Sequence, residues 1–189
     1  MSPDLDEDIV EQVDALGVTS WSGTVYRYTS ASRDALSGEG ARLNGGRWNP
    51  RGLFPTVYLA DPFPACLSEF KRMAHAFGMP PQAIIARGYL THTIAVTTLP
   101  VLDLRTDGAL DRVGLQRSDI EDQDDWTACQ AVGHAAWFLE RAGILAPSAT
   151  GEGTVLAAFE ERVGPGQLAL RASRTLLATD LSSPGAPPA

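Results

Sequence analysis

The sequence predicts a single α+β domain, and three observations support that fold class. The 189 residues are 44% hydrophobic and 20% charged, an ordinary composition for one globular domain with a sizeable core. Segments with helical periodicity occur beside segments rich in β-branched and aromatic residues. They do not alternate regularly, which favours an α+β arrangement over a doubly wound parallel sheet. We expect the domain over residues 1–180 and a disordered, Pro- and Gly-rich tail over 181–189.

Four segments of the N-terminal half have the pattern of a regular element. Apolar spacing predicts helices over 2–16 and 64–77, and β-branched and aromatic residues predict strands over 24–29 and 56–60. Because strand side chains alternate between faces, Arg27 should point away from Tyr26 and Tyr28. Glu69 lies at the border of the apolar face of the second helix, so it can reach the edge of a cleft.

The C-terminal half is predicted to hold one long helix and five strands. The strands are 83–89, 92–97, 100–104, 154–160 and 167–173. The helix, 126–141, follows Asp124 and Asp125, acidic residues that suit a helix N-terminus, and Gly143 ends it. We interpret Trp126 and Trp137 as core anchors.

A glycine-rich loop between the first two strands is the strongest local sign of a ligand site. Residues 38–52, GEGARLNGGRWNPRG, contain five glycines, and glycine lets backbone N–H groups approach an anion closely. Arg42, Arg47 and Arg51 add guanidinium groups, whose planar fork of donors suits phosphate oxygens. A surface loop with solvated arginines would have the same spacing. The segment lacks the G-K-[ST] ending of a P-loop, and no Rossmann fingerprint is present.

Charge and cysteine content argue against several function classes. Fifteen Lys and Arg against 23 Asp and Glu give a formal net charge of −8, which opposes direct binding to nucleic acid. The N-terminus does not resemble a signal peptide, and no apolar run reaches membrane-spanning length, so we expect a cytoplasmic protein without membrane contact. Cys66 and Cys129 lie in apolar helical patterns and are interpreted as buried thiols. The three histidines lack metal-ligand spacing, so no metal site is predicted.

Three separated pieces together resemble the RES domain, a family named for an arginine, a glutamate and a serine. They are Tyr26-Arg27-Tyr28, the GGRWN loop that leads to Tyr58, and Glu69. The stretches YRYTSASRDALSGEGARLNGGRWNP, VYLAD, ACLSEFKR, DDWTACQAVGHAAWFLE and PGQLALR extend the resemblance over nearly the whole chain. The family contains toxins of bacterial toxin–antitoxin pairs, some of which degrade NAD by phosphorolysis. Its fold is related to that of ADP-ribosyltransferases, which implies a mixed, split β-sheet with flanking helices.

The resemblance assigns roles to individual residues. It implies Arg27, Glu69 and Thr127 as catalytic residues, and Tyr28, Arg47, Trp48, Asn49 and Tyr58 as substrate-binding residues. The chain departs from the family at the serine, where Thr127 keeps a hydroxyl but adds a methyl group. Ser148 is a second, weaker candidate for that role.

The implied chemistry suits these residue types. Breaking the bond between nicotinamide and ribose leaves a cation-like ribosyl centre, which the Glu69 carboxylate would stabilise. Arg27 would hold the pyrophosphate or the adjoining ribose phosphate, and the rings of Tyr28 and Tyr58 would stack on a flat base. Thr127, in the first turn of its helix, and Arg47 would seat phosphate.

Several alternatives stay open from the sequence. Judged without the resemblance, Glu69 is a solvated carboxylate, Arg27 is the partner of a salt bridge, and Thr127 is an ordinary first-turn residue. Inorganic phosphate, water or a protein side chain could accept the ADP-ribosyl group, and a non-catalytic NAD-binding module is the alternative of a different class. The resemblance implies NAD as substrate, phosphate as co-substrate and no cofactor. It also implies an antitoxin partner with an Xre-like helix-turn-helix DNA-binding part that covers or fills the NAD cleft.

Overall fold

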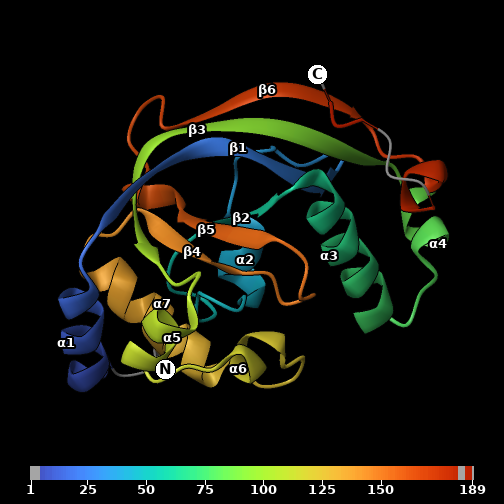
Figure 1. Cartoon of the computed structure of the whole chain (residues 1–189). Helices are drawn as coiled ribbons and strands as arrows, with labels where there is room; N and C mark the ends of the chain where they lie inside the picture. Colours follow the sequence, from blue (N-terminus) through green and yellow to red (C-terminus); the bar gives the residue numbers. More distant parts are fainter. Residues whose placement is uncertain (1–4, 183–185, 189) are drawn as a thin grey trace.

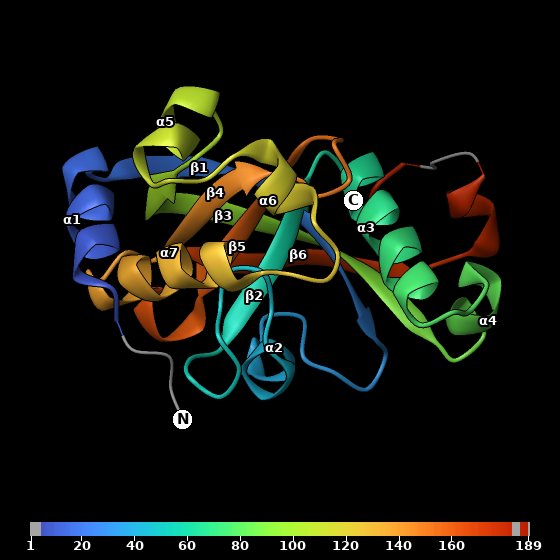
Figure 2. The same ribbon diagram turned by 90° about the horizontal axis from the view of Figure 1, so that it is seen from below.

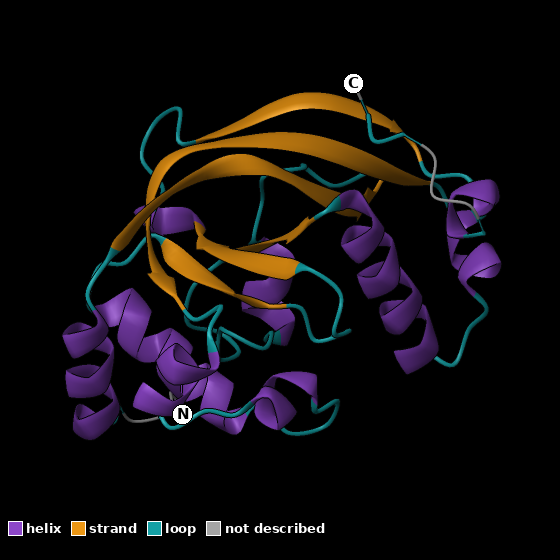
Figure 3. Cartoon of the chain, in the orientation of Figure 1, coloured by secondary structure: helices purple, strands orange, loops and turns teal. Residues whose placement is uncertain are grey.

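A six-stranded sheet with helices packed around it forms the fold (Figures 1 and 3). The computed structural model describes residues 5–182 and 186–188. The strands are β1 (Thr19–Ser30), β2 (Thr56–Asp61), β3 (Tyr89–Asp103), β4 (Gly143–Pro147), β5 (Thr154–Phe159) and β6 (Leu168–Thr175). The helices are α1 (Glu7–Leu16), α2 (Glu39–Asn44), α3 (Phe63–Ala76), α4 (Pro81–Ile85), α5 (Asp107–Arg112), α6 (Arg117–Glu121) and α7 (Thr127–Phe138), with 3-10 turns η1 (Glu160–Arg162) and η2 (Ala178–Leu181).

The sheet is mixed and strongly curved, so that five of its strands pair in a closed circuit. The strand order is β1-β2-β5-β4-β3-β6, and β1 also pairs with β3. Only the β3–β4 pair is parallel among the strands described. Strands β1, β3 and β6 arch over β2, β5 and β4 in Figure 1. The mixed sheet with flanking helices that we predicted is therefore confirmed.

The helices gather in two groups on either side of β2. Figure 2 shows α1, α5 and α7 at one end of the molecule and α3 with α4 at the other, with β2 between them; α6, which packs on α7, and the short α2 lie near β2. Close packing fixes both groups to the sheet. Phe54, just before β2, stacks on Trp137 of α7 at 4.9 Å between ring centroids and meets Phe159 of β5 edge-on at 5.0 Å, and Tyr28 of β1 meets Phe70 of α3 edge-on at 5.1 Å. Trp137 thus belongs to the packed interior, as predicted.

Local sequence explains where the best-defined helices begin. Asp6 caps α1, because its carboxylate accepts hydrogen bonds from the N–H groups of Asp8 and Ile9 at 3.0 and 3.2 Å. Helix α3 carries Pro64 in its first turn, where the missing N–H costs nothing. Helix α7 passes so close to the glycine-rich loop that a Cβ at Gly133 would collide with the Trp48 carbonyl.

Several predicted elements are wrong in type or extent. Residues 83–89, predicted as a strand, contain the end of α4, because Pro80 and Pro81 start a helical turn there. The two expected strands 92–97 and 100–104 are parts of one long strand, β3. Part of the glycine-rich loop forms α2, and α5, α6 and β4 were not predicted. Helix α7 ends at Phe138, before the predicted Arg141.

The chain ends differ from expectation where they are described. The start predicted for the first helix, at Ser2-Pro3, lies outside the described residues, and α1 begins at Glu7. Leu181, placed in the predicted disordered tail, ends η2 and is 8% exposed. Arg174 donates to the carbonyl of Ala186 at 3.0 Å, so described tail residues pack on the sheet; residues 183–185 and 189 lie outside the described residues. No helix within 5–182 and 186–188 has both the length and the apolarity to cross a membrane.

Candidate active site

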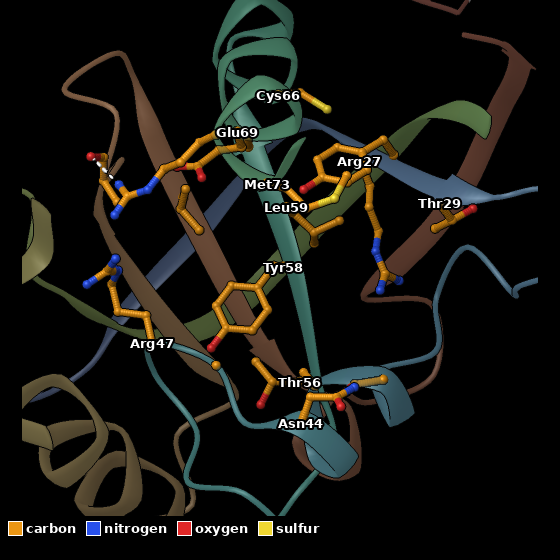
Figure 4. Close-up of a pocket in the computed structure, with 18 of the residues that line it drawn as sticks. Arg27, Thr29, Asn44, Arg47, Thr56, Tyr58, Leu59, Cys66, Glu69 and Met73 are labelled. Carbon is orange, nitrogen blue, oxygen red and sulfur yellow. Dashed lines mark hydrogen bonds between the residues drawn. The ribbon is translucent and has the colours of Figure 1, made fainter. Parts of the chain in front are cut away.

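A cleft of about 750 Å³ opens between the two helix groups, within the size range of small-molecule sites. Its walls come from β1, β2, α3 and the glycine-rich loop, as Figure 4 shows. Six predicted site residues line it together: Arg27, Tyr28, Arg47, Trp48, Tyr58 and Glu69. Asn49 and Thr127 are not among the lining residues.

Arg27 reaches across the cleft wall to the segment that follows β1. Its guanidinium donates to the carbonyl of Ala35 at 2.6 Å and to that of Ser37 at 2.9 Å. Burial lowers the pKa of Arg27 from its ordinary value. Its alternative interpretation, a salt bridge, is wrong within the described residues, because no carboxylate lies within 4.0 Å of the guanidinium. Arg27 therefore brings a positive charge that is not ion-paired to the side of the cleft.

Glu69 is held by a short chain of hydroxyl groups. Ser148, 1% exposed at the end of β4, donates to Glu69 Oε1 at 2.7 Å. The Ser148 oxygen also accepts from the Thr150 N–H at 3.1 Å and lies 2.8 Å from the Thr150 hydroxyl. A hydroxyl that is fixed from behind orients one carboxylate oxygen and leaves the other free for a ligand. Glu69 is thus oriented within the cleft.

Tyr58 fixes the shape of the glycine-rich loop. Its hydroxyl accepts from the Trp48 N–H at 2.8 Å and donates to Asn49 Oδ1 at 2.9 Å. Asn49, which is fully buried, donates in turn to the Ala41 carbonyl at 2.9 Å. A Cβ at Gly46 would lie 2.5 Å from the Tyr58 hydroxyl, so this close approach needs glycine. Asn49 therefore supports the loop through buried hydrogen bonds and does not line the cleft.

Arg47 and Arg72 both bind the C-terminal part of α6 and Asp122, the residue that follows it. Arg47 donates to the carbonyls of Asp119 at 3.2 Å and Asp122 at 2.8 Å. Arg72, on α3, donates to the carbonyls of Glu121 at 3.1 Å and Asp122 at 3.2 Å, and also to that of Ala149. The Arg47 guanidinium lies 5.4 Å from the ring centroid of Trp126, a cation–π contact. Arg72 therefore links α3 to α6, and Arg47 links the glycine-rich loop to α6.

Buried neutral groups complete the cleft wall. Burial raises the pKa of the Tyr28 and Tyr58 hydroxyls, so both stay protonated. Burial also raises the pKa of the Cys66 thiol, which lines the cleft, to about 12, and that of the Cys129 thiol, which lies outside the lining, to about 11. Both cysteines are free and buried, as predicted. The wall offers aromatic and thiol surface, and its charges come from the arginines and Glu69.

Thr127 begins α7 and is exposed to solvent. Its N–H donates to the Asp125 carboxylate at 2.9 Å. The residues beside it, Gln123 and Trp126, line the cleft in its place, so Trp126 is a wall residue rather than the core anchor we predicted. The serine that contacts Glu69 is Ser148.

Cleft residues that were not predicted from the sequence include Arg33, Arg72, Gln123 and Trp126. Arg72 follows Glu69 by three positions on α3, so helical spacing was a usable signal for it. Arg42 and Arg51, both predicted to supply charge, do not line the cleft: Arg42 pairs with Glu39, and Arg51 donates to the Leu43 carbonyl at 3.0 Å.

A smaller hollow lacks these properties. It measures about 330 Å³ beside Asp103, Arg105 and Thr106, and its arginine is ion-paired to Asp103 at 2.7 Å. Across residues 5–182 and 186–188, no three His, Cys, Asp or Glu side chains gather closely enough to hold a metal ion. The 750 Å³ cleft is thus the better candidate for an anionic ligand.

Comparisons with known proteins agree on one family. Residues 24–179 match the RES domain. The chain is 55% identical over 173 residues to the NAD(+) phosphorylase MbcT of Mycobacterium bovis and to that of Mycobacterium tuberculosis, with 92% of each chain covered. A crystal structure of the M. tuberculosis MbcT–MbcA toxin–antitoxin complex matches with a TM-score of 0.89 at 52% identity, covering 95% of this chain and 97% of that chain. The protein therefore belongs to the RES-domain family.

Proposed function

We propose that this protein is an NAD phosphorylase and the toxin of a toxin–antitoxin pair. It would transfer the ADP-ribosyl group of NAD to inorganic phosphate and release nicotinamide. The observation that supports this most directly is the charge pattern of the cleft: one oriented carboxylate, Glu69, faces a space lined by Arg27, Arg47 and Arg72. NAD carries the same pattern in reverse, since a cationic pyridinium is joined to an anionic diphosphate.

The cleft residues have different roles in the proposed reaction. Glu69 stabilises the positive charge that develops on the ribose as the bond to nicotinamide breaks. Arg27 holds the diphosphate in place, which fixes the reacting geometry before the bond breaks. The neutral rings of Tyr28 and Tyr58 supply flat surface for the nicotinamide or the adenine. Ser148, rather than Thr127, holds Glu69 in the orientation that this chemistry needs.

The partner and the cellular setting belong to the same proposal. We expect a cognate antitoxin, supported by the MbcA subunit in the related complex, with an Xre-like helix-turn-helix part that binds DNA. The toxin itself, at a net charge of −8, would leave DNA contact to that partner. We further propose a fold related to ADP-ribosyltransferases, action in the cytoplasm, and a reaction without metal or cofactor.

Proton and phosphorus NMR of NAD incubated with the protein test this function. With phosphate present, we expect nicotinamide and ADP-ribose-1″-phosphate. NAD loss that is independent of phosphate would instead indicate a glycohydrolase, labelled protein would indicate an ADP-ribosyltransferase, and binding without turnover would indicate a non-catalytic module. Glu69→Ala should abolish turnover. Glu152→Ala is the matched control. Glu152 is exposed, its carboxylate accepts a hydrogen bond from the Ser68 hydroxyl at 2.6 Å, and it does not line the cleft.

Expression in a bacterium tests the toxin role separately. Production of the protein alone should arrest growth and deplete NAD, and co-expression of the neighbouring gene product should restore both. Normal growth with normal NAD would contradict the proposal.

A further inference from the structure

We infer that Arg47 and Arg72 form the binding site for the inorganic phosphate that accepts the ADP-ribosyl group. This inference rests on the proposed function and assigns a place in the cleft to its second substrate. It gives a ligand to Arg72, which neither the sequence pattern nor the family resemblance assigned.

The two guanidinium groups are close enough for one anion to bridge them. Both contact the Asp122 carbonyl oxygen, Arg47 at 2.8 Å and Arg72 at 3.2 Å, so their Nη2 atoms lie no more than about 6 Å apart. Each guanidinium carries five N–H donors, and the described hydrogen bonds leave donors free on both. Because both residues line the cleft, we assign their remaining donors to a tetrahedral oxyanion.

Their charges are not cancelled. Every hydrogen bond that fixes the pair ends on a backbone carbonyl, and within residues 5–182 and 186–188 no carboxylate lies within 4.0 Å of either guanidinium. Two like charges held side by side repel each other: burial lowers the pKa of Arg47, and the Arg72 charge lowers it further. A dianion between them would relieve that repulsion, which makes phosphate a better occupant than water.

The pair also lies where an acceptor is needed. Arg72 donates to the carbonyl of Ala149, and Ser148, the preceding residue, donates to Glu69. Figure 4 shows Arg47 and Glu69 on one side of Tyr58 and Arg27 on the other. Phosphate at the pair would therefore stand beside the carboxylate that stabilises the ribosyl centre, while Arg27 holds the diphosphate of NAD across the Tyr58 ring.

The transfer step balances with these groups alone. One oxygen of hydrogen phosphate forms a bond to the ribose carbon that carried nicotinamide, and the bond from that carbon to the pyridinium nitrogen breaks. The electron pair of the broken bond stays on the nitrogen, so nicotinamide leaves as a neutral molecule. The phosphate retains its proton, and no oxidant or metal is required.

Steady-state kinetics with NAD and inorganic phosphate varied independently test the assignment. Arg72→Gln should raise the KM for phosphate at least about tenfold and change the KM for NAD by less than about twofold. Lys71→Gln is the matched control, because it removes the same charge from the neighbouring, exposed position of α3, outside the cleft lining. Arg72→Lys keeps the charge without the planar fork and should raise the phosphate KM by less than Arg72→Gln does.

The outcomes separate this inference from the function on which it rests. Wild-type turnover that does not depend on phosphate would overturn the proposed function. Phosphate-dependent wild-type turnover with an unchanged phosphate KM in Arg72→Gln, or with a rise in the KM for NAD alone, would overturn the phosphate site. Circular dichroism checks that the variants fold. If Arg72→Gln does not fold, the variants Arg47→Lys and Arg72→Lys test the phosphate site instead. The inference then requires that the KM for phosphate rises in both variants.

Discussion

Three arginines that line the cleft and six arginines outside it bind different kinds of partner. Arg27, Arg47 and Arg72 donate to backbone carbonyls, and Arg33 also lines the cleft. Six arginines elsewhere are paired with carboxylates: Arg42, Arg105, Arg117, Arg141, Arg162 and Arg174. A carbonyl dipole fixes a guanidinium without cancelling its charge, whereas a carboxylate fixes the guanidinium and also cancels its charge. The chain can therefore present positive charge in one place although its net charge is −8.

The largest contrast is expected between Arg27→Met and Arg105→Met. Removal of Arg27 takes the charge from the cleft and leaves the Ala35 and Ser37 carbonyls without their partner. We expect kcat/KM for NAD to fall at least about 100-fold, and the free energy of unfolding to fall by about 1–3 kcal/mol. The side chain of Arg105 is 42% exposed and is paired with Asp103. Arg105→Met should therefore lower the free energy of unfolding by at most about 1 kcal/mol and leave activity unchanged. Equal losses in both variants would remove the distinction.

The polar support of the glycine-rich loop can be tested through two tyrosines. Tyr58→Phe removes the hydroxyl that holds Trp48 and Asn49, and should lower the free energy of unfolding by about 1–3 kcal/mol in urea titration. Tyr26 also lines the cleft, but its hydroxyl makes no hydrogen bond within the described part of the chain, so Tyr26→Phe should change stability by less than about 0.5 kcal/mol. Greater loss from Tyr26→Phe would show that the loop does not depend on this network.

Ser148→Ala and Thr127→Ala separate the two candidates for the family serine. Loss of the Ser148 hydroxyl frees Glu69 to rotate, so kcat should fall about fivefold while the KM for NAD stays nearly constant. Thr127→Ala changes an exposed residue outside the cleft lining and should alter kcat by less than about twofold. The reverse ranking would place the functional hydroxyl at Thr127, as the resemblance implies.

The smallest effect is electrostatic and concerns His92, which is paired in register with Arg27 across β1 and β3. Burial lowers the pKa of His92 below its ordinary 6.5, and the charge of Arg27 lowers it further. The unfolded chain then binds more protons than the folded one below pH 6.5, so stability declines as pH falls through that value. In Arg27→Met, NMR titration should show a higher His92 pKa.

His134 is the internal control for that titration. Burial alone lowers its pKa, so Arg27→Met should leave His134 unchanged. A parallel shift of both histidines would point to general loosening of the fold rather than to the charge of Arg27.

Short-range patterns predicted the elements that depend on neighbours in sequence. Strands β1 and β2 and helix α3 follow from apolar periodicity and from Pro64. Strand β4 was missed because its five residues are all buried, and a short apolar run does not distinguish a strand from the end of a helix. The break predicted in β3 fell at Thr98, which adopts a φ of 44° without ending the strand.

The site was predictable in its residues but not in its contacts. The resemblance brought Arg27, Glu69, Arg47 and Tyr58 into one cleft, and the structure places all four there. The partners of Arg72 are backbone atoms 49 to 77 positions away in sequence, so no pattern of side chains identifies them. For the same reason, the sequence does not reveal that Arg27, Arg47 and Arg72 form no ion pair within the described residues.

Because backbone carbonyl groups hold the guanidinium groups of Arg27, Arg47 and Arg72, the residues that supply those carbonyls can vary in sequence. Every amino acid supplies the same backbone oxygen, so the anchors at 35, 37, 119, 121, 122 and 149 do not depend on which side chain stands at those positions. Substitutions there that preserve the backbone path leave the cleft charges in place. The surface around the cleft can therefore diverge, for example to match a different partner protein, while the chemistry inside is retained.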